Sequence, residues 1–430
     1  MENSATPSPE IKSLEINNTG RFKKIINSFG PGVMMATAAV GGSHLVASTK
    51  AGAIYGWQLA IIILLVNLFK YPFFRAGVQY TMGTGKSLIQ GYSELGRGYL
   101  WTFFVLMVIA SIVSTAALLM FCASLLSYFS PFELSMTANA AIILLVCLTI
   151  LFAGKYKLLD TLSKVIMLTL VVATLSALAM AIANGPVAPA DYQPPSVWDM
   201  ASIGFIVIMM GWMPGPIEVS SLTSMWLKNQ RKEKDVTIKE ALFDFNVGYI
   251  GTALLAIVFL ALGALVLNGN GETLSNSGAK FTHQLVSMYA HTIGEWSRYL
   301  IAVVAFFCIF GSTITVIDGY CRSLSEANLL LQNKELDQPK NHIGWMVGVS
   351  TVAMVILLFF TAQLMTMLNF AMALAFITTP IFALLNYRLI VKSKLTGKLA
   401  LTPKMKVLSW MGLVYLFGFL AVFIWWKWIM

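Results

Sequence analysis

Residues with binding chemistry interrupt two long apolar stretches of the chain. The first stretch runs from Gly30 to Ala53. Glycine allows a helix to unwind there with little steric penalty, and an unwound helix end leaves carbonyl oxygens with partial negative charge. The interruption also adds one hydroxyl and one imidazole. We therefore predict a binding segment made of Val40, Gly41, Gly42, Ser43 and His44.

The second interruption lies in the stretch from Met200 to Leu227. Pro214 and Pro216 lack the backbone N–H that a continuous helix needs. A methionine in this segment offers a thioether, a soft ligand suited to transition metals, and a tryptophan could close off the site. The predicted binding residues of this segment are Gly211, Trp212, Met213 and Gly215.

Two carboxylates near these apolar stretches are candidates for proton or cation coupling. Glu218 follows the second interruption, and a carboxylate inside a membrane span is a functional candidate by default. Asp318 lies just after Ser312, Thr313 and Thr315, although its i,i+4 spacing from Arg322 also favours a structural ion pair. His44 is the one histidine that falls inside a predicted span, so it is a metal-ligand candidate together with Met213.

The composition identifies the elements that hold these residues. The 430 residues are 57% hydrophobic and 11% charged, and the mean hydropathy is +0.75, which excludes a soluble globular domain. The first 26 residues are polar and are predicted to form a disordered cytoplasmic tail ahead of a transporter domain, 27–430. The predicted membrane spans are 27–52, 57–80, 100–128, 134–153, 158–183, 199–227, 243–268, 296–321, 343–361, 364–388 and 406–427.

Basic residues in the loops predict the orientation of these eleven helices. Of the 29 Lys and Arg residues, 22 fall in the segments that lie inside if the N-terminus is cytoplasmic, four lie outside and three lie within spans. The positive-inside rule then places the C-terminus outside. Anionic lipid headgroups account for the net charge of +10, so no nucleic-acid partner is expected.

The span count also predicts an internal symmetry. Residues 27–183 and 199–388 would form two repeats of five helices, and 406–427 would be an additional helix. Because five is odd, the two repeats enter the membrane from opposite sides and are inverted. Paired interruptions in the first helix of each repeat are typical of the substrate site of a secondary transporter. No nucleophile–base set, zinc-ligand spacing or phosphate loop suggests an enzyme, and no cofactor is expected.

Several short motifs resemble one transporter family. They are Gly30-Pro31-Gly32, Gly52, Tyr55-Gly56-Trp57, Thr84-Gly85-Lys86 and Met213-Pro214. The sequence resembles Nramp-type divalent-metal transporters, the natural resistance-associated macrophage protein family. This resemblance implies an all-α integral membrane protein of the cell inner membrane, with the LeuT-like inverted-repeat fold, broken helices 1 and 6, alternating access and proton symport.

The chain departs from the family pattern at several ligands. The family's first break reads Asp-Pro-Gly-Asn, where this chain has Gly41-Gly42-Ser43-His44, and Gly215 and Ser220 stand where the family has histidines. The predicted third span holds Ser111, Ser114 and Thr115 in place of acidic residues. Met213 alone is carried over as a matched ligand.

Two hypotheses for the cargo follow. The first is a divalent cation held by His44, Met213 and backbone carbonyls, with Glu218 as a further ligand. The second is an organic solute, such as an amino acid or small carboxylate, held by the N-terminal ends of the half-helices. The breadth of the resemblance favours the metal. The sequence gives no expectation for the oligomeric state.

Overall fold

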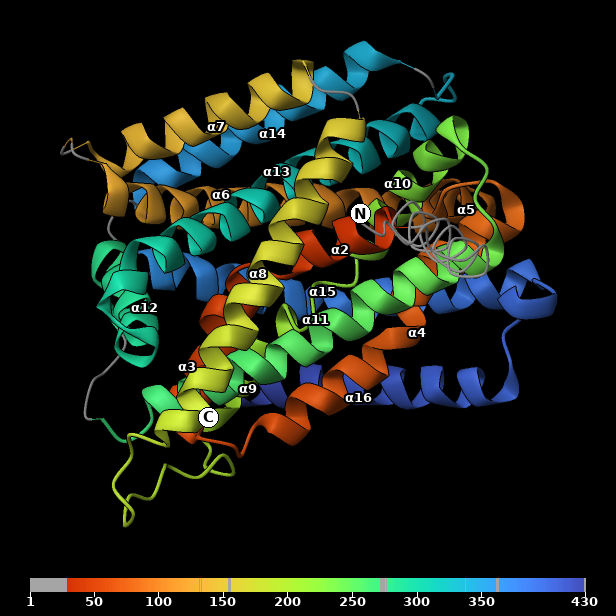
Figure 1. The fold of residues 1–430 in the computed structure, drawn as a ribbon. Helices are drawn as coiled ribbons and strands as arrows, with labels where there is room; N and C mark the ends of the chain where they lie inside the picture. The colour runs from red at the N-terminus through yellow and green to blue at the C-terminus, as the bar shows by residue number, and fades with distance from the viewer. Residues whose placement is uncertain are drawn as a thin grey trace, which may run out of the picture.

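The computed structural model describes residues 29–428, with gaps at 131, 133, 154–155, 271–274, 276, 337 and 361–362. Within these residues every regular element is a helix (Figure 1). The predicted disordered tail, residues 1–26, lies outside the described residues. The described part of the chain, which includes both interrupted stretches, is therefore all-helical.

Nine helices among the described residues are long and apolar enough to cross a membrane. Each coincides with one of the predicted uninterrupted spans, with ends that differ by a few residues and by ten at the C-terminal end of α13. They are α4 (Ala60–Thr84), α6 (Arg97–Phe129), α7 (Met136–Ala153), α8 (Tyr156–Asn184), α11 (Ile238–Val266), α13 (Arg298–Leu331), α14 (Pro339–Phe360), α15 (Leu364–Ser393) and α16 (Pro403–Trp428).

The two interrupted stretches fold as broken helices. The first consists of α2 (Pro31–Ala39), a π-helical turn η1 (Ser43–Ser48) and α3 (Thr49–Tyr55). The second consists of α9 (Ser202–Gly211) and α10 (Val219–Glu233), joined by an unwound segment that contains both prolines. The helices thus break at the positions where glycine and proline predict an interruption. Whether each broken helix crosses the membrane, as the count of eleven spans requires, stays a prediction.

Four short elements were not predicted from the sequence. They are α5 (Leu88–Leu95), α12 (Gly278–Ile293), and the single 3-10 turns η2 (Glu295–Ser297) and η3 (Gly397–Leu399). Helix α5 begins with a capping box, in which the Ser87 side chain accepts from the Gln90 N–H and the Gln90 side chain accepts from the Ser87 N–H. Both longer elements connect spans rather than form them.

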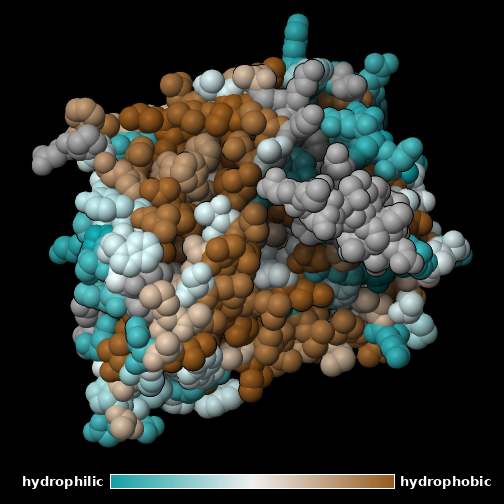
Figure 2. All heavy atoms as spheres, in the orientation of Figure 1, coloured by the Kyte–Doolittle hydropathy of each residue, from teal (hydrophilic) through white to brown (hydrophobic). Residues whose placement is uncertain are grey.

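The helices are arranged around α13 and α6, which pack against each other. The most apolar part of α13 is 78% buried, against 28% for those of α7 and α14, which lie side by side at one edge of the bundle (Figure 1). At the opposite edge α16 packs on α4. Figure 2 shows hydrophobic side chains in a band across the middle of one face and hydrophilic ones toward two opposite ends, as expected for a multi-pass membrane protein.

Segments predicted to lie on the cytoplasmic side contact one another. Lys228 at the end of α10 donates hydrogen bonds to Gln90 in α5 and Glu326 in α13, both at 2.9 Å. Arg97 at the start of α6 donates to the Leu331 carbonyl at 2.9 Å. These contacts place the connections after α4, α10 and α13 at the same end of the molecule, which agrees with the predicted alternation of helix directions.

The first broken helix lies against α11 with almost no side chain between the two backbones. A Cβ added at Gly32 would lie 2.2 Å from the Asp244 carbonyl oxygen, and one at Gly248 would lie 2.2 Å from the Gly32 carbonyl oxygen. The same reciprocal arrangement recurs between Gly52 of α3 and Gly263 of α11. Small residues at these points let membrane helices approach closely, and they fix both halves of the broken helix to α11.

Candidate functional site

The two breaks lie against each other, as the paired interruptions predict. A Cβ added at Gly42 would lie 2.8 Å from Cζ3 of Trp212, and one at Gly215 would lie 3.3 Å from Cβ of Ala39. The Ser48 hydroxyl in η1 lies 4.0 Å from the Met213 sulfur. The two predicted binding segments therefore meet between α2–α3 and α9–α10, and they make one candidate site.

Neighbouring groups satisfy the carbonyl oxygens freed at the first break. Ser312 on α13 donates to Thr37 O at 2.8 Å and lies 3.2 Å from Val40 O, and the Cys308 thiol also donates to Val40 O. The Ser43 hydroxyl lies 2.6 Å from Ala39 O. The C-terminal end of α2 is thus held by the adjacent Ser43 and by two side chains of α13. The sequence analysis did not predict this role for Cys308.

The glycines at the breaks are needed for space rather than for unusual backbone angles. Gly42 has helical angles, φ −55° and ψ −31°, so an L-residue could adopt its conformation. A Cβ at Gly41, however, would lie 2.5 Å from the Ser312 hydroxyl, and one at Gly211 would lie 2.0 Å from the Met372 carbonyl oxygen. Close packing is therefore a second reason for glycine at these positions, and the helix does break at Gly41-Gly42 as the sequence predicts.

His44 is fully buried and faces α11. Its Nε2 lies 2.9 Å from the Thr252 carbonyl oxygen, which can only accept, so Nε2 carries a hydrogen and donates. Its Nδ1 lies 2.6 Å from the Ser43 hydroxyl, and its ring meets the edge of Phe259. Both ring nitrogens already have partners, so His44 would have to exchange one of them before it could bind a metal ion.

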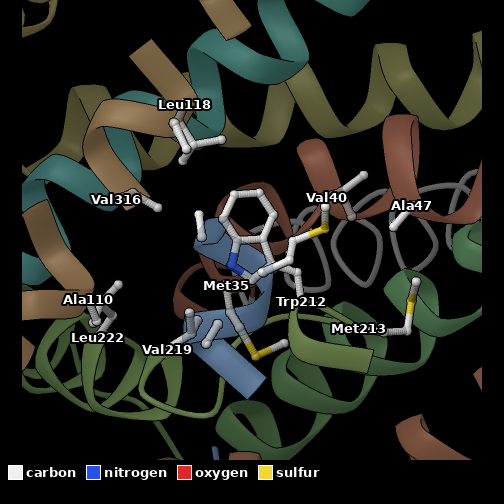
Figure 3. Close-up of a cluster of buried hydrophobic side chains, with 14 of the residues drawn as sticks. Met35, Val40, Ala47, Ala110, Leu118, Trp212, Met213, Val219, Leu222 and Val316 are labelled. Atoms are coloured by element: carbon white, nitrogen blue, oxygen red, sulfur yellow. The ribbon is translucent and has the colours of Figure 1, made fainter. Parts of the chain in front are cut away.

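Met213 and Trp212 occupy the unwound part of the second break. Met213 is fully buried and Trp212 is 5% exposed, and the indole Nε1 has no hydrogen-bond partner. Figure 3 shows Trp212 amid apolar side chains, with Leu118 and Val316 on one side and Val40 on the other. Met213 and Trp212 are therefore packed largely among apolar side chains, to which Met213 adds a thioether sulfur.

A lysine that the sequence analysis counted only as a charge within a span belongs to this site. Lys70 of α4 is fully buried, and its Nζ donates hydrogen bonds to the carbonyl oxygens of Met210, Gly211 and Gly215. A cation in the middle of an apolar helix was the available signal, because intramembrane charges are functional candidates by default. The ammonium group of Lys70 thus binds the carbonyl oxygens at the C-terminal end of α9.

The two predicted coupling carboxylates occupy different environments. Glu218 is fully buried; its Oε1 accepts from the Tyr320 hydroxyl at 3.4 Å, and its Oε2 has no partner. Asp318 accepts from Arg322 at 2.7 Å and 2.8 Å and from the Trp226 indole at 3.1 Å. Glu218 therefore adjoins the second break with an unsatisfied oxygen, whereas Asp318 has strong hydrogen-bond partners away from it.

The described residues contain no group of three or more His, Cys, Asp or Glu side chains placed to hold a metal ion. The residues of both breaks, 40–44 and 211–218, are all buried. A cavity of about 670 Å³ opens beside α12, lined in part by Asn184, Asn270 and His283, and one of about 240 Å³ lies near Lys228 and His342. Neither cavity is lined by residues of the breaks.

Solved structures share this arrangement of helices. A mutant of the manganese transporter of Eremococcus coleocola is similar with a TM-score of 0.67 and 14% identity, covering 94% of this chain and 87% of that one. The nucleobase-cation-symport-1 family transporter Mhp1, closed with bromovinylhydantoin bound, gives a TM-score of 0.59 and 12% identity over 93% and 92%. The chain thus has the LeuT-like fold of secondary transporters.

The family is shown by sequence. The model of the natural resistance-associated macrophage protein-like family matches residues 32–426, so the chain belongs to that family. An uncharacterized protein of Pasteurella multocida (strain Pm70) is 49% identical over 400 residues, which is 92% of each chain. The resemblance carried by the short motifs is therefore confirmed.

Proposed function

We propose that this chain is a secondary active transporter that moves divalent metal cations by alternating access. The observation that carries the proposal is Met213, a fully buried thioether at the point where the two breaks meet. Membership in the Nramp-like family and the fold shared with a manganese transporter support a metal cargo. Two broken helices that meet at a buried site support alternating access, because this arrangement is typical of secondary transporters.

The ligand set predicts a preference for softer ions. A thioether suits transition metals, whereas magnesium and calcium take oxygen ligands, usually with carboxylates among them. Met213 would be supplemented by backbone carbonyls of the breaks, and Glu218 would offer its unpartnered oxygen. His44 would become a ligand only after it gives up its hydrogen bond to Thr252 or to Ser43.

Calorimetric titration of the purified protein tests the proposal. Manganese, iron(II), cobalt, cadmium and magnesium are titrated into wild type and Met213→Ala. Met346→Ala, a buried methionine on α14, is the matched control. Saturable binding of a softer ion that only Met213→Ala weakens would support the metal site. A folded, monodisperse protein that binds none of these ions would rule it out.

An organic solute is the second candidate, and one observation favours it. Lys70 already occupies three carbonyl oxygens at the second break, and a fixed ammonium group near the site repels a metal ion but attracts a carboxylate. Amino acids and small carboxylates are therefore the next ligands to titrate, and binding of one of them without metal would select this candidate.

The location and orientation complete the proposal. We place the chain in the cell inner membrane with its N-terminus in the cytoplasm and its C-terminus outside, because of the excess of Lys and Arg in the connections on one side. Proton coupling through Glu218 or Asp318 is part of the same proposal. Of the two, Glu218 has the unsatisfied oxygen that proton exchange needs.

A further inference from the structure

Lys70 binds the second break through backbone oxygens from both sides of its turn. The distances from Nζ are 2.7 Å to Met210 O, 3.1 Å to Gly211 O and 3.2 Å to Gly215 O. The first two carbonyls end α9, and the third precedes α10 by a few residues. One nitrogen therefore joins the two sides of the unwound segment.

The hydrogen-bond chemistry shows which form of Lys70 fits. A carbonyl oxygen only accepts, and an ammonium group has three N–H donors for the three oxygens. A neutral amine has two, and its lone pair would face an oxygen. The C-terminal end of α9 also carries partial negative charge from the helix dipole. Three oxygens and this dipole make a site for a cation.

A buried carboxylate supplies the balancing charge. Glu218 lies three residues after Gly215, is fully buried and interacts electrostatically with Lys70. Among the described side chains it forms no ion pair within 4.0 Å, and its Oε2 has no hydrogen-bond partner. Glu218 therefore compensates the charge at a distance, while the backbone oxygens coordinate the ammonium group.

We propose that the carbonyls of Met210, Gly211 and Gly215 form a monovalent-cation site whose resident cation is the ammonium group of Lys70. Tethered to α4, it takes the place of a freely exchanging sodium or potassium ion. This inference goes beyond the proposed function, because it concerns what holds the second break in shape and applies to either cargo. The wild-type protein then needs no sodium or potassium ion at the three carbonyls. When the ammonium group is removed, a free monovalent cation is able to bind them.

The variant Lys70→Ala tests this directly, because it removes the equivalent of propylammonium. Thermal unfolding is followed at constant ionic strength in choline, sodium, potassium and propylammonium chloride. Wild type is expected to unfold at the same Tm in all four. Lys70→Ala is expected to unfold at a lower Tm in choline and to recover by about 2 °C or more, saturably, in at least one of the others.

Two further variants make the test decisive. Lys164→Ala removes a lysine of α8 that pairs with the Asp160 carboxylate at 2.7 Å, so its Tm should not recover selectively. Lys70→Ala with Glu218→Gln keeps the three carbonyls but leaves no unpaired buried carboxylate, so it serves as the test protein if Lys70→Ala does not fold. It should recover in the same salts as Lys70→Ala but by less, because the entering cation then lacks its balancing charge. A Tm that recovers with no cation in either Lys70 variant, or a wild type that requires sodium, would overturn the proposal. Neither result depends on metal binding.

Discussion

At the scale of single residues, some side chains at the breaks hold the backbone in place, and others are able to bind a cargo. His44 is hydrogen-bonded to Ser43 and to the Thr252 carbonyl oxygen, and Ser312 and Cys308 donate to carbonyl oxygens at the end of α2. The Met213 sulfur accepts one long hydrogen bond, from the Ser48 hydroxyl at 4.0 Å. The thioether is therefore bound less tightly by polar neighbours than the His44 ring is.

This difference predicts effects of different size for two substitutions. His44→Gln keeps an amide that can donate to Thr252 O, so the Kd of a bound metal should change by less than about threefold, whereas Met213→Ala should raise it at least about tenfold. Titration calorimetry on both variants measures this. If His44→Gln weakens binding as much as Met213→Ala does, His44 turns in the bound state and is a ligand.

The buried pair Lys70 and Glu218 predicts non-additive stability effects. Lys70→Ala leaves the Glu218 carboxylate without its compensating charge, and Glu218→Gln does the converse for the ammonium group. The double variant should therefore be more stable than the sum of the single effects by about 1 kcal/mol or more. Lys164→Ala combined with Glu218→Gln is the control pair. Effects that add to within about 0.5 kcal/mol, measured by reversible unfolding, would show that the two charges are independent.

At the scale of elements, the sequence predicted all helices that are long and apolar and both places where a helix breaks. It missed α5 and α12 because neither has an apolar run long enough for a span, although Ser87 and Gln90 have the spacing of a capping box. It missed the role of Lys70 for a different reason. Which carbonyls face α4 depends on how α9 and α10 pack on it, and spacing along the chain does not encode that.

The close approach of α11 to the first broken helix gives a prediction at this scale. A Cβ at Gly263 would lie 2.1 Å from the Thr49 carbonyl oxygen, and a backbone atom cannot rotate away as a side chain can. Gly263→Ala should therefore destabilise the protein by about 3 kcal/mol and lower transport.

Gly251→Ala is the matched control on the same helix, because no atom lies within 4 Å of a Cβ added there. Its Tm should equal or slightly exceed that of wild type, since alanine favours a helix over glycine. Equal losses of Tm in the two variants would mean that glycine matters along α11 generally, and that the contact with α3 has no special role.

At the scale of the whole molecule, the contacts among connections fix which segments share a side, and the basic residues predict which side is the cytoplasm. Lys228, Gln90 and Glu326 meet at one end of the bundle. At the other end Gln58 donates to the Pro195 carbonyl, and the Val187 N–H donates to Leu265. Labelling one residue at each end therefore determines the orientation of every helix between them.

The four native cysteines are buried, so a membrane-impermeant maleimide should leave wild type unlabelled in intact cells. Asp191→Cys, exposed between α8 and α9, should be labelled in intact cells. Lys232→Cys, exposed near the end of α10, should be labelled only after the membrane is permeabilised. Because the two sites are separated by one broken helix, they must lie on opposite sides if α9 and α10 together cross the membrane. The reverse labelling pattern would invert the proposed orientation, and labelling of both sites in intact cells would mean that α9 and α10 do not cross.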